Sequence, residues 1–395
     1  MENTSFELDP DLDPSTELEE VALDSGTQTE PEIAQPSRSL LAASSVPAIG
    51  TALSRVTGLM RVAALTAALG LTSIADVYNL ANTSPNIIYE LVIGGVLSST
   101  LVPLFIQAHH DRERGIDDDA ESVMVTVGLT AITVLTVVAI LASPVINHFF
   151  AMPLHGAEKT HQIRLGTTFL MLLFPQVYFY GLTTLATALL HSRRRFAAPA
   201  FAPVLTNVVI SITAIAVYKL NLGSTNEMRT VYLLGLGTTA GIAAMAVALL
   251  PAIRRAEISL KWDFRPRHPA VKSVIRLSGW TVGFAVSNQV ALLIILTFAR
   301  GAGVGAVSAY QYAFIFFQLP YGLIAVSLMT AVLPELASAA NSKDESAFAE
   351  KFREGLSLML TLMIPAAVAY LFFGRSLIAV LLQRGQFDAE ATQAT

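Results

Sequence analysis

The stretch TALSRVTGLMRVAALTAALG, residues 51–70, is apolar, helix-forming and long enough to cross a bilayer, yet it carries Arg55 and Arg61 well inside its ends. A membrane span needs about 20 largely apolar residues. A charged side chain at the centre of such a helix costs roughly 2.5–3.5 kcal/mol on insertion scales. A polar partner or water must therefore lie beside this helix and offset that cost.

The composition of the whole chain predicts an all-α, polytopic membrane protein. It is 53% hydrophobic and 14% charged over 395 residues, whereas soluble domains are about 25% charged. Disulfides are excluded because there is no cysteine. The seven histidines show no metal-ligand spacing, and we find no phosphate-binding glycine loop and no nucleophile elbow. We therefore expect no cofactor, no metal, no nucleic-acid partner and no enzymatic activity.

Turns and charge clusters separate nine expected helices, and their loops predict an orientation. The helices are 45–70, 76–107, 122–150, 165–191, 198–219, 230–253, 272–299, 304–338 and 354–373. With the N-terminus in the cytoplasm, the inner loops hold fifteen Lys or Arg and the outer loops five. Since cytoplasmic loops carry the excess of positive charge, this asymmetry favours a cytoplasmic N-terminus.

Three regions follow from these patterns. Residues 1–42 form an acidic tail, with eleven acidic residues and one basic residue in the first forty. Such a segment buries too little apolar surface to fold alone, so we expect a disordered cytoplasmic tail, with docking of a soluble partner as the alternative. Residues 43–255 form a first membrane lobe, and residues 256–395 begin a second. The final RGQFDAEATQAT resembles a connection, so the second lobe is expected to be incomplete.

Polar residues inside the first two helices are not scattered. Ser54, Gly58 and Arg61 share one face of the first helix, because each residue turns about 100°. A second stripe follows the next helix and consists of Asn79, Asn82, Asn86 and Glu90. At about 1.5 Å of rise per residue, Glu90 lies between the two arginines in depth.

Two interpretations of this arrangement stay open. One is an internal salt-bridge cluster that only joins the two helices. The other is a hydrated, basic cavity that receives an anionic headgroup, which the excess of Arg55 and Arg61 over Glu90 favours. Guanidinium groups match phosphate in bidentate fashion. Gln318 in the eighth helix is a weaker candidate for the opposite wall.

A short internal similarity indicates how the helices are grouped. LSSTLVPLF at 97–105 matches LMTAVLPEL at 328–336 after a shift of 231 residues. Six spans separate the two copies, so both have the same orientation. This predicts two parallel six-helix lobes around a central cavity, and such lobes can rock to give alternating access.

Several motifs resemble the MviN/MurJ family, bacterial flippases of lipid II. They are SRVTGLMR at 54–61, ADVYNLA at 75–81, PNIIYE at 85–90, GGVLSSTLVP at 94–103, LPYGLIAVSL at 319–328 and RGQF at 384–387. The resemblance implies the fold of multidrug and polysaccharide exporters, and it implies that this chain stops after nine of about fourteen helices. It also implies that Arg55 and Arg61 are cavity arginines and that Asp76 is the acidic residue opening the second helix. Tyr89 and Glu90 depart from the arginine pair of many relatives.

The resulting hypothesis is a flippase of the bacterial plasma membrane. It would move an undecaprenyl-pyrophosphate-linked cell-wall precursor from the cytoplasmic to the outer leaflet. Arg55 and Arg61 would hold pyrophosphate, Glu90 would orient them, and the asparagine stripe would bind sugar; Ser54, Asp76 and Gln318 complete the candidate set. A multidrug or solute exporter of the same fold is the first alternative. The second is a non-transporting scaffold that recruits cell-wall proteins through the acidic tail.

Overall fold

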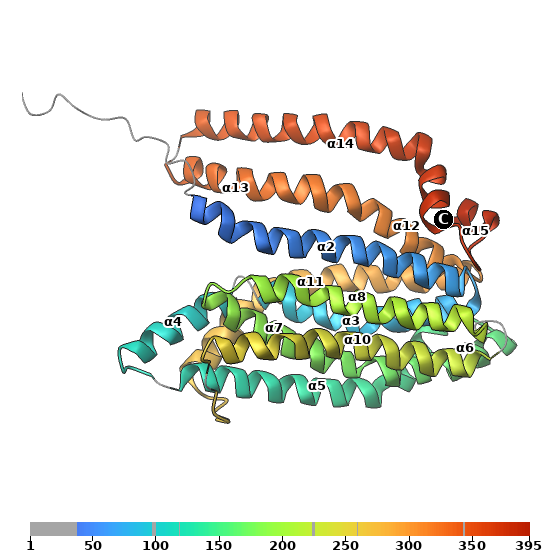
Figure 1. The fold of residues 1–395 in the computed structure, drawn as a ribbon, viewed down its shortest axis with the longest axis horizontal. Helices are drawn as coiled ribbons and strands as arrows, with labels where there is room; N and C mark the ends of the chain where they lie inside the picture. Colours follow the sequence, from blue (N-terminus) through green and yellow to red (C-terminus); the bar gives the residue numbers. More distant parts are fainter. Residues whose placement is uncertain (1–37, 97–99, 118, 223–225, 259, 343) are drawn as a thin grey trace, which may run out of the picture. The chain divides into compact units, whose positions relative to one another are not determined.

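The computed structural model describes residues 38–96, 100–117, 119–222, 226–258, 260–342 and 344–395, and these residues contain helices and turns but no β-strand (Figure 1). The helices are α2 (Arg38–Leu69), α3 (Ser73–Val96), α4 (Val102–Glu113), α5 (Ala120–Phe150), α6 (Gly156–Leu173), α7 (Pro175–Ser192), α8 (Ala197–Lys219), α10 (Glu227–Arg255), α11 (Pro269–Ala302), α12 (Ala306–Pro320), the π-helical turn η2 (Tyr321–Ala325), α13 (Val326–Asn341), α14 (Glu345–Leu382) and α15 (Ala389–Ala394). Most of the predicted acidic tail lies outside the described residues, as does the start of the 97–105 repeat. The contacts described below are within Pro47–Thr395, which clusters apart from Met1–Val46.

Seven segments among the described residues are long and apolar enough to cross a membrane. They are Ile49–Leu69, Ala120–Phe150, Gly156–Ser192, Ala197–Lys219, Glu227–Arg255, Ala285–Ala302 and Glu345–Leu382. The prediction of an all-α membrane bundle is therefore confirmed. Helix α3 is not among the seven and carries the polar stripe, while α12 and α13 have 15 and 16 residues and are separated by η2.

Prolines account for two breaks in helices that the sequence predicted as continuous. Pro175 is the first residue of α7, so the predicted helix 165–191 is split at Phe174 into α6 and α7. Proline has no N–H and clashes with the preceding turn. Pro320 likewise ends α12, and the π-helical turn that follows leads into α13.

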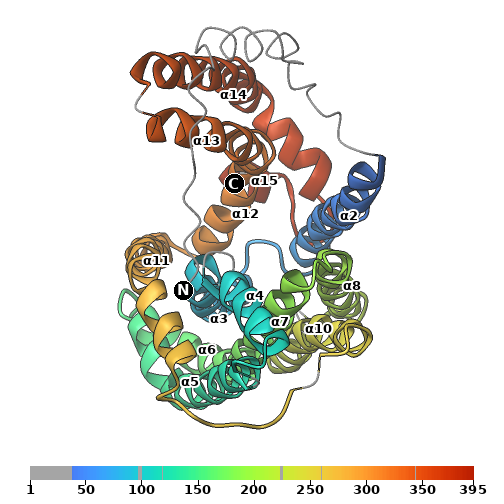
Figure 2. The ribbon, with the colours of Figure 1, turned by 90° about the vertical axis from the view of Figure 1, so that its left-hand side faces the viewer.

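The helices pack as two groups with α2 beside both (Figure 2). In the first group, α10 packs against α6, α7 and α8, and α3 packs against α6 and α7. Its main buried cluster includes Tyr78, Phe169 and Leu234. The second group contains α12, α13, α14 and α15, and its buried cluster includes Val62 of α2. Helix α11 packs against α3 and α5, so the chain after residue 255 returns to the first group before it forms the second.

Candidate functional site

The middle of α2 carries the two candidate arginines and is attached to α8 by one asparagine. Asn207 is buried, and its Nδ2 donates to the Ser54 carbonyl at 3.0 Å and to Thr57 Oγ1 at 3.1 Å. Arg55 is exposed and Arg61 is partly exposed. The Asn207 contact therefore sets the rotation of α2 at the level where both guanidinium groups emerge.

Replacing Asn207 with alanine is expected to lower the stability of this attachment. Two hydrogen bonds from a buried side chain would be lost, each worth about 0.5–1.5 kcal/mol, although the Ser54 carbonyl would keep the hydrogen bond from Thr57 Oγ1. Thermal unfolding of the detergent-solubilised chain measures the change as a lower Tm. Ser211→Ala is the matched control, because Ser211 Oγ donates only to its own helix at the Asn207 carbonyl. An equal Tm for Asn207→Ala and Ser211→Ala would contradict the assignment.

The polar stripe of α3 divides into two parts with different surroundings. Near the start of α3, Asn79 Nδ2 donates to Ser308 Oγ at 3.0 Å. Further along, Asn86 Oδ1 accepts a hydrogen bond from the Tyr180 hydroxyl at 2.9 Å. Between them, the buried Oδ1 of Asn82 has no hydrogen-bond partner among the described residues. The stripe thus contains one amide oxygen, that of Asn82, that has no protein partner in the described structure.

An aromatic pair and two charged residues, Arg61 and Glu90, lie near this far part of the stripe. The rings of Tyr89 and Tyr180 have centroids 4.1 Å apart. Arg61 interacts electrostatically with the Tyr180 hydroxyl, as does Glu90, which is exposed. Within the described residues no ion pair joins Arg55, Arg61 or Glu90 to any partner within 4.0 Å. The internal salt-bridge cluster, which was one of the two open interpretations, is therefore not formed in this conformation.

Asp76 lies apart from these charges, at the start of α3. It is fully buried. Its Oδ2 accepts from the Gly305 N–H at 2.7 Å, and its Oδ1 accepts from the N–H and Oγ of Ser308 at 2.9 and 2.7 Å. Asp76 thus caps the N-terminus of α12 from another helix, where free N–H groups and the helix dipole favour a carboxylate. In this conformation its oxygens are occupied by protein groups rather than free for a substrate.

A buried arginine extends this cluster to a third helix. Arg300 in the last turn of α11 is fully buried, and its Nη1 lies 3.6 Å from Asp76 and 3.2 Å from Glu158 of α6. Its Nε donates to Gln162 Oε1 at 3.4 Å. Because an unpaired buried charge is costly, these contacts hold the end of α11 to α3 and α6. Asp76, Arg300 and their partners together are called the end cluster below.

The sequence missed three members of these sites. Arg300 was placed in an outer loop because the seventh helix was expected to end at 299, whereas α11 continues to Ala302. Tyr180 was missed because no local pattern in the sequence links it to Asn86. Asn207 was missed because a single amide in an apolar helix forms no pattern. Of the remaining candidates, Ser54 is half-buried and Gln318 is exposed on α12.

The fold is the one found in solved structures of membrane transporters. A solved structure described as lipid II flippase MurJ in an inward closed conformation superposes with a TM-score of 0.70 at 24% identity, covering 88% of this chain and 69% of that one. An inward-facing multidrug resistance MATE family transporter of the MOP superfamily gives a TM-score of 0.66 at 13% identity, covering 90% and 78%. The predicted exporter fold is therefore confirmed.

The chain belongs to the MurJ family. The family model described as lipid II flippase MurJ matches residues 65–395. Lipid II flippase MurJ of Burkholderia cenocepacia is 32% identical over 348 residues, which cover 86% of this chain and 65% of the relative. Probable lipid II flippase MurJ of Rhizobium meliloti is 32% identical over 86% of this chain and 62% of its own length. The chain thus spans a little under two thirds of the length of these relatives.

Proposed function

We propose that this chain moves a lipid-linked, pyrophosphate-bearing cell-wall precursor of the lipid II type across the bacterial plasma membrane. The observation that carries the proposal is the set of charges at the middle of α2 and α3. Arg55 and Arg61 have no acidic partner among the described residues, although Glu90 is on the facing helix. Positive charge left over on a helix long and apolar enough to cross a membrane suits a phosphate group, which guanidinium binds in bidentate geometry.

The polar groups around Arg61 suit the rest of such a ligand. Asn82 and Asn86 on α3 present amide groups, and the Asn82 oxygen lacks a partner in the described structure. Sugar hydroxyls can both donate to and accept from amides. In this proposal Arg55 and Arg61 hold pyrophosphate and Glu90 orients them. The asparagines bind sugar, Ser54 lines the approach on α2, and Gln318 lines the opposite wall on α12.

The end cluster gives Asp76 a separate role in the proposed transport. Asp76 and Arg300 join α3, α6, α11 and α12 at one end of the molecule, so this end is closed while their contacts last. Moving α12 away from α3 would break the hydrogen bonds from Gly305 and Ser308 to Asp76. We therefore propose that Asp76 controls a gate and contacts substrate only after that gate opens.

The proposal includes an orientation and partners. The N-terminus and the loops rich in arginine face the cytoplasm, so that the end cluster faces outward and the precursor enters from the inner leaflet. Residues 1–42 are a cytoplasmic acidic tail that is available to a regulatory or cell-wall protein. The action is transport without a chemical change in the lipid, so no catalytic residue, metal or cofactor is assigned.

A reconstituted transfer assay tests this function. The full chain is placed in vesicles that contain fluorescent lipid II, and a membrane-impermeant reductant bleaches only the outer leaflet. In protein-free vesicles only the lipid of the outer leaflet is bleached. Lipid II that crosses the membrane raises the bleached fraction above that value. Fluorescent phosphatidylcholine in matched vesicles controls for scrambling. Transfer of a cationic drug with none of lipid II would favour the multidrug exporter, and transfer of neither would leave the scaffold.

A further inference from the structure

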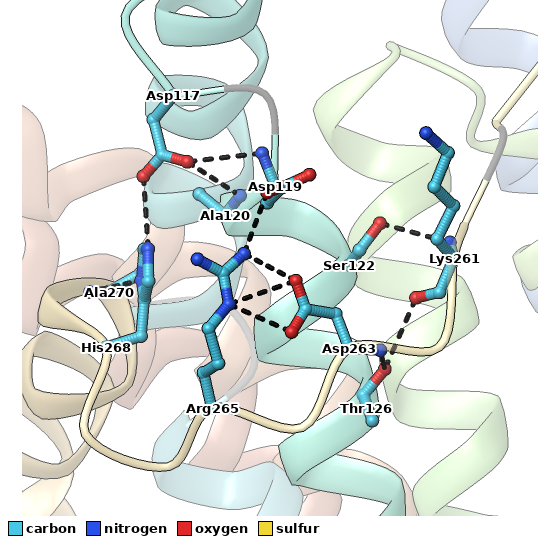
Figure 3. Close-up of polar contacts among 10 residues, drawn as sticks. All are labelled: Asp117, Asp119, Ala120, Ser122, Thr126, Lys261, Asp263, Arg265, His268 and Ala270. Atoms are coloured by element: carbon cyan, nitrogen blue, oxygen red, sulfur yellow. Dashed lines mark hydrogen bonds and ion pairs between the residues drawn. The ribbon is translucent and has the colours of Figure 1, made fainter.

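Residues 260–267, which lie between α10 and α11, cross the start of α5 without helical structure (Figure 3). The Lys261 N–H donates to Ser122 Oγ at 3.2 Å, and the Asp263 N–H donates to Thr126 Oγ1 at 3.1 Å. Thr126 Oγ1 in turn donates to the Lys261 carbonyl at 3.5 Å. One turn of α5 therefore holds the backbone of this segment in a definite register.

Charged contacts hold the far end of the same segment. Arg265 bonds to Asp119 at 2.8 Å and forms hydrogen bonds with Asp263 (Figure 3). His268 lies 3.3 Å from Asp117, just before α5. The hydrogen bonds from Arg265 keep the pKa of Asp263 below its usual range, so this carboxylate is ionised at neutral pH. The segment is thus attached along its length rather than free to move as a loop.

This attachment leaves large apolar side chains uncovered. Asp263 and Arg265 pair with each other, and Arg265 also reaches Asp119 at the start of α5. The side chains of Leu260, Trp262 and Phe264 take no part in these contacts. They are 38%, 74% and 52% exposed. Three large apolar side chains in a row on the outer face of a rigid segment are an unpartnered apolar surface.

The place of this surface in the fold indicates what covers it. The segment passes along the outside of α5 at one end of the helix group (Figure 2). Further along α5, Val134, Val137 and Leu141 are 58%, 50% and 74% exposed, as expected of a helix face in contact with lipid tails. Val134 is eight residues beyond Thr126, which is about 12 Å along a helix. The segment therefore lies where the lipid-facing surface of α5 ends and the headgroup layer begins.

The charges around the surface match an anionic membrane. Residues 254–267 contain five Lys or Arg and two acidic residues. Arg254, Arg255, Lys261 and Arg267 are exposed. Of the two acidic residues, Asp263 is paired with Arg265 and Glu257 is exposed. Basic residues next to exposed Trp and Phe are the combination that binds the interface of membranes containing anionic lipid.

We propose that residues 260–267 are an interfacial anchor, with Leu260, Trp262 and Phe264 inserted at the headgroup level of the adjacent leaflet. The exposed basic residues, Arg254, Arg255, Lys261 and Arg267, bind the phosphates of anionic lipids in that leaflet. The anchor holds the connection between α10 and α11 on the membrane surface beside α5. It depends on the chain being embedded in a membrane and not on which lipid the chain transports.

The tryptophan content of the chain permits a direct test. Trp262 and Trp280 are its two tryptophans, so Trp280→Phe makes Trp262 the sole reporter. This variant is reconstituted into vesicles of phosphatidylglycerol and phosphatidylcholine. We expect blue-shifted emission, protection from iodide, and stronger quenching by lipids brominated near the glycerol end of the acyl chain than by lipids brominated near the methyl end. Emission typical of tryptophan in water, with full access to iodide, would overturn the anchor.

A charge variant tests the lipid preference separately. In vesicles of phosphatidylcholine alone, the blue shift and the iodide protection are expected to be smaller. Neutralising Arg254, Arg255 and Arg267 to glutamine should remove this difference between the two lipid compositions. Arg194→Gln with Arg195→Gln is the matched control, because both arginines are exposed on the turn after α7 and form no ion pair with residues 260–267 in the described structure. If the protein that carries Trp280→Phe alone gave equal spectra in both lipid compositions, the role of anionic lipid would be overturned.

Discussion

Replacing Arg61 with alanine is expected to abolish lipid II transfer while the protein stays folded in the membrane. In the proposed site Arg61 forms charge-assisted hydrogen bonds to pyrophosphate, each worth about 1.5–3 kcal/mol. Loss of two such bonds reduces transfer by about a hundred-fold or more, since 1.4 kcal/mol corresponds to a factor of ten. Arg61 has no ion pair within the described structure, so the change leaves no buried acid without a partner.

The Arg61 prediction is measured with the transfer assay, and two variants make it specific. Arg61→Lys retains the charge and loses the bidentate geometry, so we expect intermediate transfer. Arg164→Ala removes an exposed arginine from α6 and should behave as the parent protein. Normal transfer by Arg61→Ala, at equal protein per vesicle, would remove the phosphate-binding role from Arg61.

Replacing Asp76 with asparagine is expected to open the end cluster. The change removes the negative charge beside the fully buried Arg300, and breaking a buried ion pair on one side costs about 3–5 kcal/mol. Arg300 then keeps the hydrogen bond to Gln162, and its remaining acidic partner in the described structure is Glu158, whose side chain is 42% exposed. The contact between α3 and the start of α12 is therefore weakened in the closed conformation.

Cysteine labelling measures this opening cleanly because the chain has no cysteine of its own. Val307→Cys places a thiol at a fully buried position of α12, which a maleimide should label slowly in the detergent-solubilised protein. Adding Asp76→Asn should make that labelling much faster. Met152→Cys, exposed at the same end of the molecule, serves as the control that labels in both backgrounds. Unchanged labelling of Val307→Cys would show that Asp76 does not hold this end closed.

A double variant distinguishes loss of the buried Asp76–Arg300 ion pair from a general loss of stability. Arg300→Gln alone should also speed the labelling of Val307→Cys, since it leaves Asp76 with N–H donors but no counter-charge. Residues in direct contact have non-additive effects. The combination of Asp76→Asn with Arg300→Gln should therefore disturb the cluster less than the sum of the two single changes.

The positions of four of the nine expected helices could be predicted closely from local pattern. Expected and observed bounds agree within three residues for 122–150, 198–219, 230–253 and 272–299. Ends were missed where polar residues belong to a helix, as in α14, which runs from Glu345 to Leu382 although only 354–373 was expected. Hydropathy detects the part of a helix that meets lipid, whereas the helix itself continues through charged residues into water.

The sequence by itself determined that the chain is a bundle of membrane helices and that Arg55, Arg61 and the α3 stripe are polar groups within it. Hydrophobicity and helical periodicity are local properties, so neighbouring residues are enough to read them. Only the tertiary structure decided that Asp76 caps α12, that Arg300 is buried beside it, and that Tyr180 meets Asn86. These partners are between 94 and 232 residues apart in the chain, and only the packing of one helix on another determines which of them meet.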